Sequence, residues 1–308
     1  MMIGEEGEWM FGLHAEQRVF DIGGVKVGGI PGKDPTVLIG TIFYRKQKLV
    51  QDERRGIFDR DQAEKLIRRQ EELSDVTGNP CMLDVEGSTA QALEKYINFA
   101  AENTDVPLMI GGPTPEVRET GLNLVEEGGL ADRVVYNSLM PGCGVDEIEK
   151  ISEAGVTSAV MLAYNVTDLT SSGRINALTG LLDASQGLGI EKPLLDTFVM
   201  DVPSLGIAFQ ALTKVKTDLG LPAGCGPHNA IGLWKGLRKK MGLRSIRSIV
   251  ASVNAFAASA GADWILYGPL EAAGVVFPSV AMVDAAYAFP RISEGARLSG
   301  NHPLFKIA

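Results

Sequence analysis

The chain has 308 residues, of which 45% are hydrophobic and 22% are charged, and its formal net charge is −9. This composition is typical of a soluble globular protein and excludes a collagen-like or disordered chain. The acidic balance leaves no surplus of Lys and Arg to neutralise phosphates. We therefore expect no nucleic-acid partner and no attachment to anionic lipid.

Cysteine usage and the apolar stretches predict a cytoplasmic protein. The three cysteines, Cys81, Cys143 and Cys225, are odd in number and far apart, which disfavours a disulfide framework and favours a reducing compartment. The amino terminus, MMIGEEGEWMF, lacks the apolar region of a signal peptide. The stretch over 248–268 is very apolar but contains polar residues and reads as helix, turn and strand. We expect no membrane insertion.

Short apolar runs recur along the chain after a predicted hairpin over 18–29. They lack polar alternation, which is typical of strands that are buried on both faces of a parallel sheet. Eight strands are predicted, over 36–44, 80–85, 107–111, 133–138, 157–164, 193–199, 221–225 and 263–268.

Amphipathic helices with recognisable ends are predicted between the strands. Asp59 is a candidate N-cap for a helix that ends at Gly78, and Ser88 with Gln91 fits a capping box. Thr114–Pro115 combines an N-cap with proline at the first helical position. Later helices are predicted over 145–155, 174–189, 204–219, 229–241, 245–260 and 276–289.

Eight strand–helix units predict a (β/α)8 TIM barrel with a short N-terminal hairpin, in a single domain over 1–308. A doubly wound open sheet is the alternative. No GxGxxG sequence follows the first strand, which disfavours the dinucleotide-binding version of that alternative.

Polar residues gather at the predicted carboxyl ends of the strands, where barrel enzymes place their chemistry. Carboxylates accept hydrogen bonds from ring N–H and amino groups, and carboxamides both donate and accept. This inventory favours a flat, nitrogen-rich ring as ligand, and its shortage of cations disfavours a multiply phosphorylated one. The residues are Tyr44, Asp84, Glu86, Asn137, Asn165, Asp196, His228, Asn229, Gly268 and Glu271, with Asp201 as a helix lead-in.

The segment AGCGPHNAIGL, 223–233, first suggests a metal site or a nucleophile with its base. Zinc needs further ligands beyond Cys225 and His228, and the other histidines, His14 and His302, lie at the two ends of the chain. Cys225 lies between two glycines, which favours a packed residue over a reactive thiol. We expect no protein-bound metal. On physical grounds alone, Asn229 is a helix N-cap.

The order of GIPG, PTVLIGTIFY, DQAEKLIRRQEELSDVTGNP, VVYNS, GPHNA, YGPLEAA, FPSVAMVDAAYA and HPLFK resembles the H-subunit family of tetrahydromethanopterin S-methyltransferase. That family also contains bacterial methylcorrinoid:tetrahydrofolate methyltransferases. The resemblance runs from about residue 16 to the carboxyl terminus. It implies methyl transfer between N5 of a tetrahydropterin and the cobalt of a corrinoid carried by a partner protein.

The resemblance also assigns roles to individual residues. In related pterin-binding barrels an Asn and an Asp hold the ring and a second Asn approaches N5, and the matching positions are Asn137, Asp196 and Asn229. Asn229 and Asp196 are the expected catalytic residues. Asn165, His228 and Gly268 are expected to contact the pterin as well.

One position departs from the pattern of the relatives. They place an Asp where Gly111 stands, so Asp84 or Glu86 is expected to supply the missing carboxylate. This departure favours the bacterial branch that uses tetrahydrofolate. Tetrahydromethanopterin in a larger complex is the alternative, and a homodimer is expected because such barrels are often dimers.

Two rival functions differ in class from a methyltransferase. A barrel lyase or aldolase needs a Schiff-base lysine, and no predicted strand end carries one. A non-catalytic subunit that docks a corrinoid protein remains an alternative.

Overall fold

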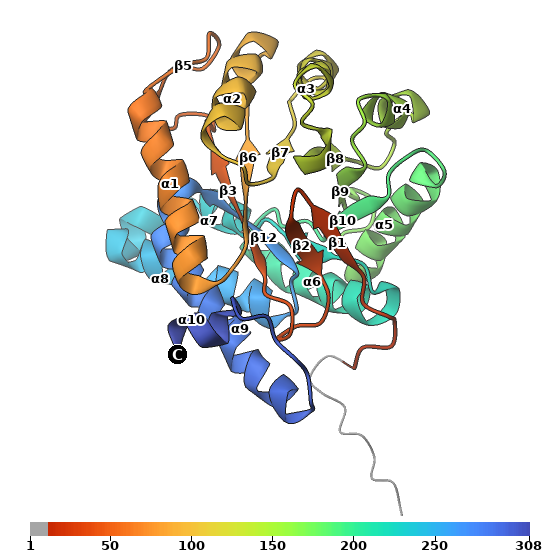
Figure 1. Cartoon of the computed structure of the whole chain (residues 1–308), viewed down its shortest axis with the longest axis vertical. Helices are drawn as coiled ribbons and strands as arrows, with labels where there is room; N and C mark the ends of the chain where they lie inside the picture. The colour runs from red at the N-terminus through yellow and green to blue at the C-terminus, as the bar shows by residue number, and fades with distance from the viewer. Residues whose placement is uncertain (1–11) are drawn as a thin grey trace, which may run out of the picture.

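Eight parallel strands form a closed barrel in the computed structural model, which describes residues 12–308 (Figure 1). The first and last of them, β3 and β12, pair with each other, so the predicted barrel is confirmed and the open-sheet alternative is wrong. The expected domain and the signal-peptide prediction both include residues 1–11, which lie outside the described residues. The barrel strands are β3 (Val37–Ile42), β6 (Cys81–Val85), β7 (Leu108–Ile110), β8 (Val134–Leu139), β9 (Ser158–Leu162), β10 (Lys192–Asp196), β11 (Ala223–Cys225) and β12 (Trp264–Pro269).

Helices follow the strands and form the outer layer. Their N-caps at Asp59 and Thr114 and the left-handed C-cap at Gly78 are confirmed. The prediction that Ser88 caps α2 is wrong. Thr89 accepts the capping hydrogen bond, and Ser88 donates to the carbonyl of Glu53 instead. The helices are α1 (Arg60–Thr77), α2 (Ala90–Asn103), α3 (Pro115–Glu127), α4 (Val145–Glu153), α5 (Ser171–Ser185), α6 (Val202–Lys214), α7 (His228–Gly232), α8 (Leu237–Ser259), α9 (Ala273–Ser293) and α10 (Pro303–Ile307).

The predicted N-terminal hairpin closes the amino end of the barrel. Strands β1 (Val19–Ile22) and β2 (Val25–Gly28) pair antiparallel, and Figure 1 shows them lying across the ring of barrel strands. Ile22 and Val27 join the barrel interior, which is filled by Val37, Ile39, Met82, Met109, Val135, Val160, Leu194 and Trp264. The interior is therefore a packed core, and only the carboxyl end is left for a ligand. A second small hairpin, β4 (Val50–Asp52) with β5 (Ile57–Phe58), was not predicted.

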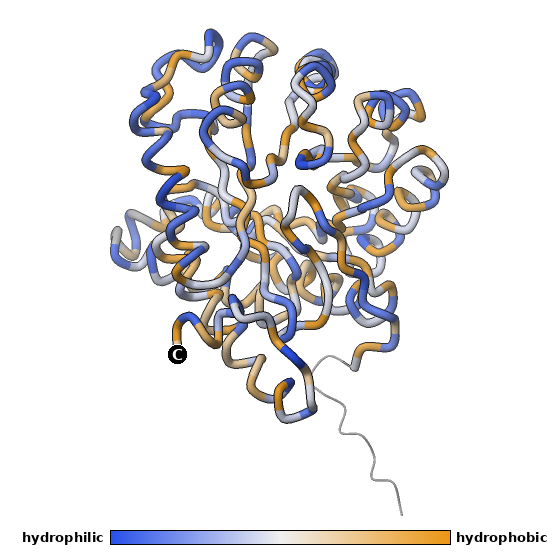
Figure 2. The backbone as a smooth tube through the Cα atoms, viewed as in Figure 1, coloured by the Kyte–Doolittle hydropathy of each residue, from blue (hydrophilic) through white to orange (hydrophobic). Residues whose placement is uncertain are grey.

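The strand residues that point outward form the larger core with the helices. Leu38 and Leu83, neighbours of the inward-facing residues, lie in this outer layer because strand side chains alternate between faces. Figure 2 shows hydrophobic residues along the central strands and hydrophilic turns on the outer helices α1 and α2.

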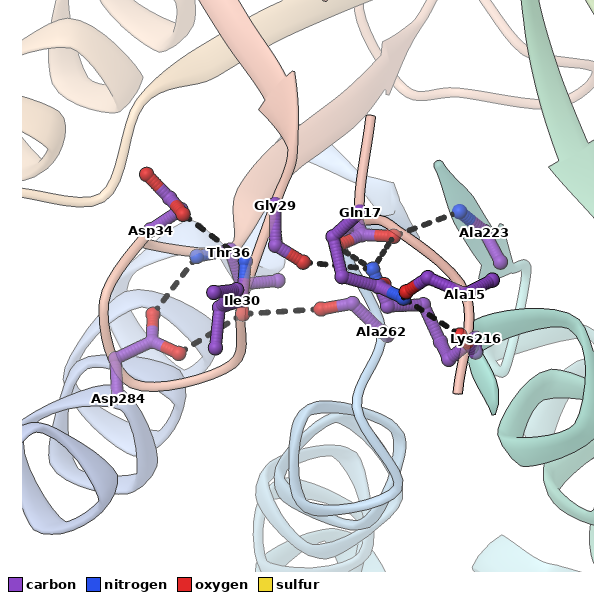
Figure 3. A network of polar contacts seen from close by, with 11 residues as sticks. Ala15, Gln17, Gly29, Ile30, Asp34, Thr36, Lys216, Ala223, Ala262 and Asp284 are labelled. Carbon is purple, nitrogen blue, oxygen red and sulfur yellow. Dashed lines mark hydrogen bonds and ion pairs between the residues drawn. The ribbon is translucent and has the colours of Figure 1, made fainter. Parts of the chain in front are cut away.

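A buried ionic network joins the amino-terminal segment to the amino end of the barrel (Figure 3). Lys216 is fully buried, and its Nζ donates to both carboxylate oxygens of Asp263 at 2.8 and 2.9 Å and to the carbonyl of Gly29 at 2.8 Å. Asp263 also accepts from the backbone N–H of Ala223, and Gln17 donates to the carbonyl of Lys216. Burial raises the pKa of Asp263, and the ammonium of Lys216 opposes that effect.

Helix α9 has the length and apolar composition of a membrane span, although it forms part of the barrel wall. The described helical stretch that meets those criteria is Leu270–Ser293. It packs against α1, α8 and α10. Its buried Asp284 accepts hydrogen bonds from Thr36 and Asn79, which ties the helix to the first barrel strand.

Replacing Lys216 with Met is expected to lower the free energy of unfolding by about 3–5 kcal/mol, because Asp263 loses its cation while it stays buried. Urea denaturation at neutral pH measures this difference. Lys214→Met is the matched control, because Lys214 is two residues away and less buried, and its loss should change stability by less than about 0.5 kcal/mol. Equal stability of the two variants would contradict the role of the ion pair.

Candidate functional site

A cavity of about 370 Å³ opens at the carboxyl ends of β3, β6, β7 and β8. It brings together three residues that the sequence analysis named, Asp84, Glu86 and Asn137. Its other lining residues are Phe43, Arg45, Glu53, Val85, Gly87, Ser88, Gly111, Gly112 and Pro113.

Asp84 is held at the base of this cavity by two side chains from other strands. It is 2% exposed, its Oδ2 accepts from Thr41 Oγ1 at 2.9 Å, and its Oδ1 accepts from Asn137 Nδ2 at 3.2 Å. Burial raises the pKa of Asp84 to about 6, and the two hydrogen bonds limit the rise because they favour the ionised form. The carboxylate is therefore fixed in position and titrates close to neutral pH.

Glu86 lies two residues further along the chain and is reached by solvent. The surrounding protein and the negative charge of Asp84 raise the pKa of Glu86 to about 7. Two carboxyl groups in one cavity disfavour simultaneous ionisation, so this pair can hold a proton near neutral pH.

Gly111 fits its position because no side chain can stand there. A Cβ atom on Gly111 would lie 1.8 Å from the carbonyl oxygen of Asn137. The aspartate that relatives were expected to carry here cannot be accommodated with this backbone. Asp84 and Glu86 both line the same cavity, and the replacement of that aspartate by one of them stays a prediction.

Asp196 is buried at the carboxyl end of β10, on the other side of the barrel mouth. Its Oδ1 accepts from the backbone N–H of Phe198 at 2.7 Å, and Phe198 has a positive φ of 58°. The buried Arg174 donates to the carbonyls of Thr197 and Phe198 and so supports this strained turn. Burial raises the pKa of Asp196 to about 7, and the charge of Arg174 opposes the rise.

His228, Asn229 and Gly268 form a second group beside Asp196. The prediction that Asn229 is a helix N-cap is wrong. Pro227 is the N-cap of α7, and Asn229 Nδ2 donates to the carbonyl of Val199 at 3.1 Å. His228 Nδ1 lies 2.8 Å from the carbonyl oxygen of Leu266, and burial lowers the pKa of its ring. Gly268 has a φ of 84°, and a Cβ there would lie 2.7 Å from the His228 ring.

Asn165 belongs to neither group. Its Oδ1 accepts from Thr167 and Asp168, and its Nδ2 donates to the carbonyl of Gly173. All of its polar side-chain atoms are therefore used to shape the loop between β9 and α5. Its contact with a pterin stays a prediction. Asp201 caps α6 in a capping box with Ser204, the lead-in role that the sequence predicted.

Cys225 does not have the surroundings of a nucleophile. It is fully buried, and burial raises the pKa of its thiol well above the ordinary value, so the thiolate is disfavoured at neutral pH. Among residues 12–308, no three His, Cys, Asp or Glu side chains cluster as metal ligands.

Sequence reasoning missed two polar residues that position the carboxylates. Thr41 stands in the apolar run of the first strand, and a lone hydroxyl there was an available signal. Arg174 lies on α5 and carried no signal, because only the fold brings it beneath the turn that follows β10.

The fold and the site together define a (β/α)8 barrel with a mouth lined by carboxylates and carboxamides. The chain matches the family described as "Tetrahydromethanopterin S-methyltransferase MtrH subunit" over residues 15–297. It therefore belongs to this family of methyltransferase subunits, as the resemblance implied.

Curated relatives share more than a third of their residues with this chain. The H subunit of tetrahydromethanopterin S-methyltransferase from Methanopyrus kandleri is 41% identical, with 88% of this chain and 90% of the relative covered. The same subunit from Methanothermobacter thermautotrophicus is 38% identical, with 97% and 100% covered. The H subunit of a putative mtx methyltransferase from Methanosarcina barkeri is 37% identical, with 96% and 99% covered.

Solved structures with the same fold are dihydropteroate synthases. The Yersinia pestis enzyme with a pterine-sulfa conjugate has a TM-score of 0.60 at 14% identity, with 87% of this chain and 99% of that chain covered. The Xanthomonas albilineans enzyme in complex with 7,8-dihydropteroate has a TM-score of 0.56 at 16% identity, with 88% and 98% covered. At these identities the similarity shows the fold alone.

Proposed function

We propose that this protein transfers a methyl group between the cobalt of a corrinoid carried by a separate protein and N5 of tetrahydrofolate. Membership of the methyltransferase family supports the reaction type. The cavity lined with Asp84 and Asn137, together with Asp196 at the end of β10, supports a pterin ring as the acceptor. The second candidate acceptor is tetrahydromethanopterin, which appears in the names of relatives that are 37–41% identical. The departure at Gly111 favours tetrahydrofolate.

The pterin ring presents N–H and amino donors along one edge, which carboxylates recognise well. We assign Asp196 to this edge because its carboxyl group is buried, so that a hydrogen bond from the ring forms in a medium of low polarity. Asp84 and Asn137 form a preassembled pair across β6 and β8 for the remaining ring groups. His228 and Gly268 line the same end of the barrel as secondary contacts.

Methyl transfer requires the alignment of three atoms and little covalent chemistry from the protein. A corrinoid on a docked carrier protein would supply the methyl group, and the electron pair of the carbon–cobalt bond would stay on cobalt. The lone pair of N5 would form the new bond to carbon, and the N5 proton would pass to solvent water at the open barrel mouth. Asn229 suits this step because Nδ2 is anchored on Val199, which leaves Oδ1 to accept a hydrogen bond from N5–H. The lone pair of N5 is then directed out of the barrel.

Asp196→Ala is expected to weaken tetrahydrofolate binding by about 1.5–3 kcal/mol, or roughly 10- to 150-fold, as is typical of a hydrogen bond to a charged group. Calorimetric titration with tetrahydrofolate and tetrahydromethanopterin measures this loss and identifies the preferred pterin. Because the pKa of Asp196 is about 7 and the ionised form accepts the bond, wild-type affinity should fall as pH drops below 7. If Asp196→Ala binds both pterins with wild-type affinity, Asp196 does not contact the pterin.

Asn229→Ala is expected to lower kcat by roughly 10²-fold, with a smaller change in pterin affinity, because the carboxamide acts on N5 as the bond forms. Single-turnover methyl transfer followed by the cobalt spectrum measures kcat. Asn123→Ala is the matched control, because that carboxamide is exposed on α3 and belongs to neither group of site residues. An unchanged kcat in Asn229→Ala would rule out this role.

We also propose a homodimer formed through the outer faces of α8 and α9. Phe256, Met282 and Phe289 are 60%, 60% and 67% exposed on these adjacent helices. The chain has no charged residue over 248–262, and over 272–290 its one charged residue, Asp284, is buried. Outer helices of soluble proteins normally carry charges, and apolar patches of this kind mark interfaces. A second copy suits this face because two chains of net charge −9 can meet here without repulsion between exposed charges.

Met282→Glu combined with Phe289→Glu should convert the dimer into a monomer, because carboxylates would be buried without partners in the interface. Light scattering after size exclusion at micromolar concentration measures the mass. Val166→Glu, an equally exposed apolar residue in the loop between β9 and α5, should leave the dimer intact. A monomeric wild type, or wild type that sediments with lipid vesicles, would contradict the proposal.

A further inference from the structure

One segment beside the barrel mouth carries positive charge without any acidic residue. Six Lys and Arg residues fall within 235–247, and no Asp or Glu occurs from 219 to 262. We call residues 233–247 the cationic lip. Its cations are Lys235, Arg238, Lys239, Lys240, Arg244 and Arg247.

The cationic lip begins where the second group of site residues ends. It follows α7, whose first turn carries His228 and Asn229, and it continues into the first part of α8. Figure 1 shows α7 and the start of α8 at the left of the molecule, at the edge of the barrel. Gly236, with a positive φ, is the N-cap of α8, Gly242 kinks the helix, and α7 packs against both α8 and β12. The lip is therefore attached directly to the mouth.

Five of the six cations of the lip are described by the structure, and these five face solvent. Lys235, Lys239, Lys240, Arg244 and Arg247 are all exposed, and none of them takes part in an ion pair among the described residues. Helix α1 provides the contrast, because its Arg68 and Arg69 pair with Glu64 and Glu72. A helix face that is exposed only for solubility commonly carries both signs of charge, as α1 does. The cationic lip carries positive charges only.

Apolar side chains are interspersed with these charges. Leu233 and Met241 are 57% and 51% exposed. A shallow groove between α7 and α8 is lined by Ile231, Trp234, Gly236, Leu237, Lys239 and Ile246. The cations are spread along the chain from Lys235 to Arg247, on both sides of the kink at Gly242. Dispersed cations around apolar contacts fit a protein surface better than a small anion.

We propose that the cationic lip docks an acidic surface of the protein that carries the corrinoid. This inference rests on the proposed function and names the contact that brings the cobalt to the mouth. A carrier that delivers its methyl group must bind and leave in every cycle, and complementary charge accelerates such encounters without a large interface. The lip adjoins Asn229 without being part of the ring-binding group, so it can hold the carrier while the pterin stays in place.

The test uses Lys235→Gln, Lys239→Gln and Lys240→Gln combined in the full chain. The probes are a purified corrinoid protein from the source organism, loaded with methylcobalamin, and free methylcobalamin. With the loaded protein, kcat/KM should fall about 10-fold at low ionic strength and lose most of its salt dependence. The rate with free methylcobalamin and the Kd for tetrahydrofolate should not change.

The matched control is Lys26→Gln, Lys33→Gln and Lys65→Gln, which removes the same charge from sites outside the lip. The control should retain the wild-type kcat/KM and salt dependence, and circular dichroism checks both variants for folding. An unchanged kcat/KM in the lip variant overturns docking and leaves the proposed function intact. A higher Kd for tetrahydrofolate in the lip variant overturns the docking proposal and indicates that the lip binds the anionic tail of the pterin. A wild type that transfers from neither probe refutes the proposed function and the docking with it.

Discussion

The pairing of β12 with β3 is the constraint on which the site depends. It closes the sheet, so the carboxyl ends of all eight strands meet around one mouth. Within this sheet, Asn137 on β8 donates to Asp84 on β6 across β7, although 53 residues separate them. The hairpin that blocks the amino end leaves this mouth as the open end of the barrel.

Charged side chains differ in burial and pairing between three regions of the molecule. The buried Lys216–Asp263 pair stabilises the amino end, where full burial makes the loss of either partner costly. At the mouth, burial raises the pKa values of Asp84 and Asp196 toward neutrality. Beside it, Lys235, Lys239, Lys240, Arg244 and Arg247 are exposed and outside any ion pair within the described region. Charged side chains are thus paired where they are buried at the amino end, shifted in pKa at the mouth and solvated beside it.

Much of the fold followed from short-range sequence signals, and the errors arose where tertiary contacts overrode them. Eight buried strands and the caps at Asp59 and Thr114 were predictable because apolar runs and cap chemistry are local. Asn229 has the residue type of an N-cap, yet its side chain donates to Val199, which only the closed barrel brings near. Asn165 lies at a strand end like the others, but local loop bonds use all of its polar side-chain atoms.

The sequence alone determined the (β/α)8 architecture, the family and the inventory of carboxylates and carboxamides at the strand ends, because strand periodicity and residue type are written along the chain. Tertiary structure decided which of them meet. It placed Asp84 with Glu86 and Asn137 in one cavity, and it left no space for a side chain at Gly111. It also brought Arg174 beneath the turn after Asp196. Distances between strands and the burial that sets each pKa depend on closure of the barrel, which no local pattern encodes.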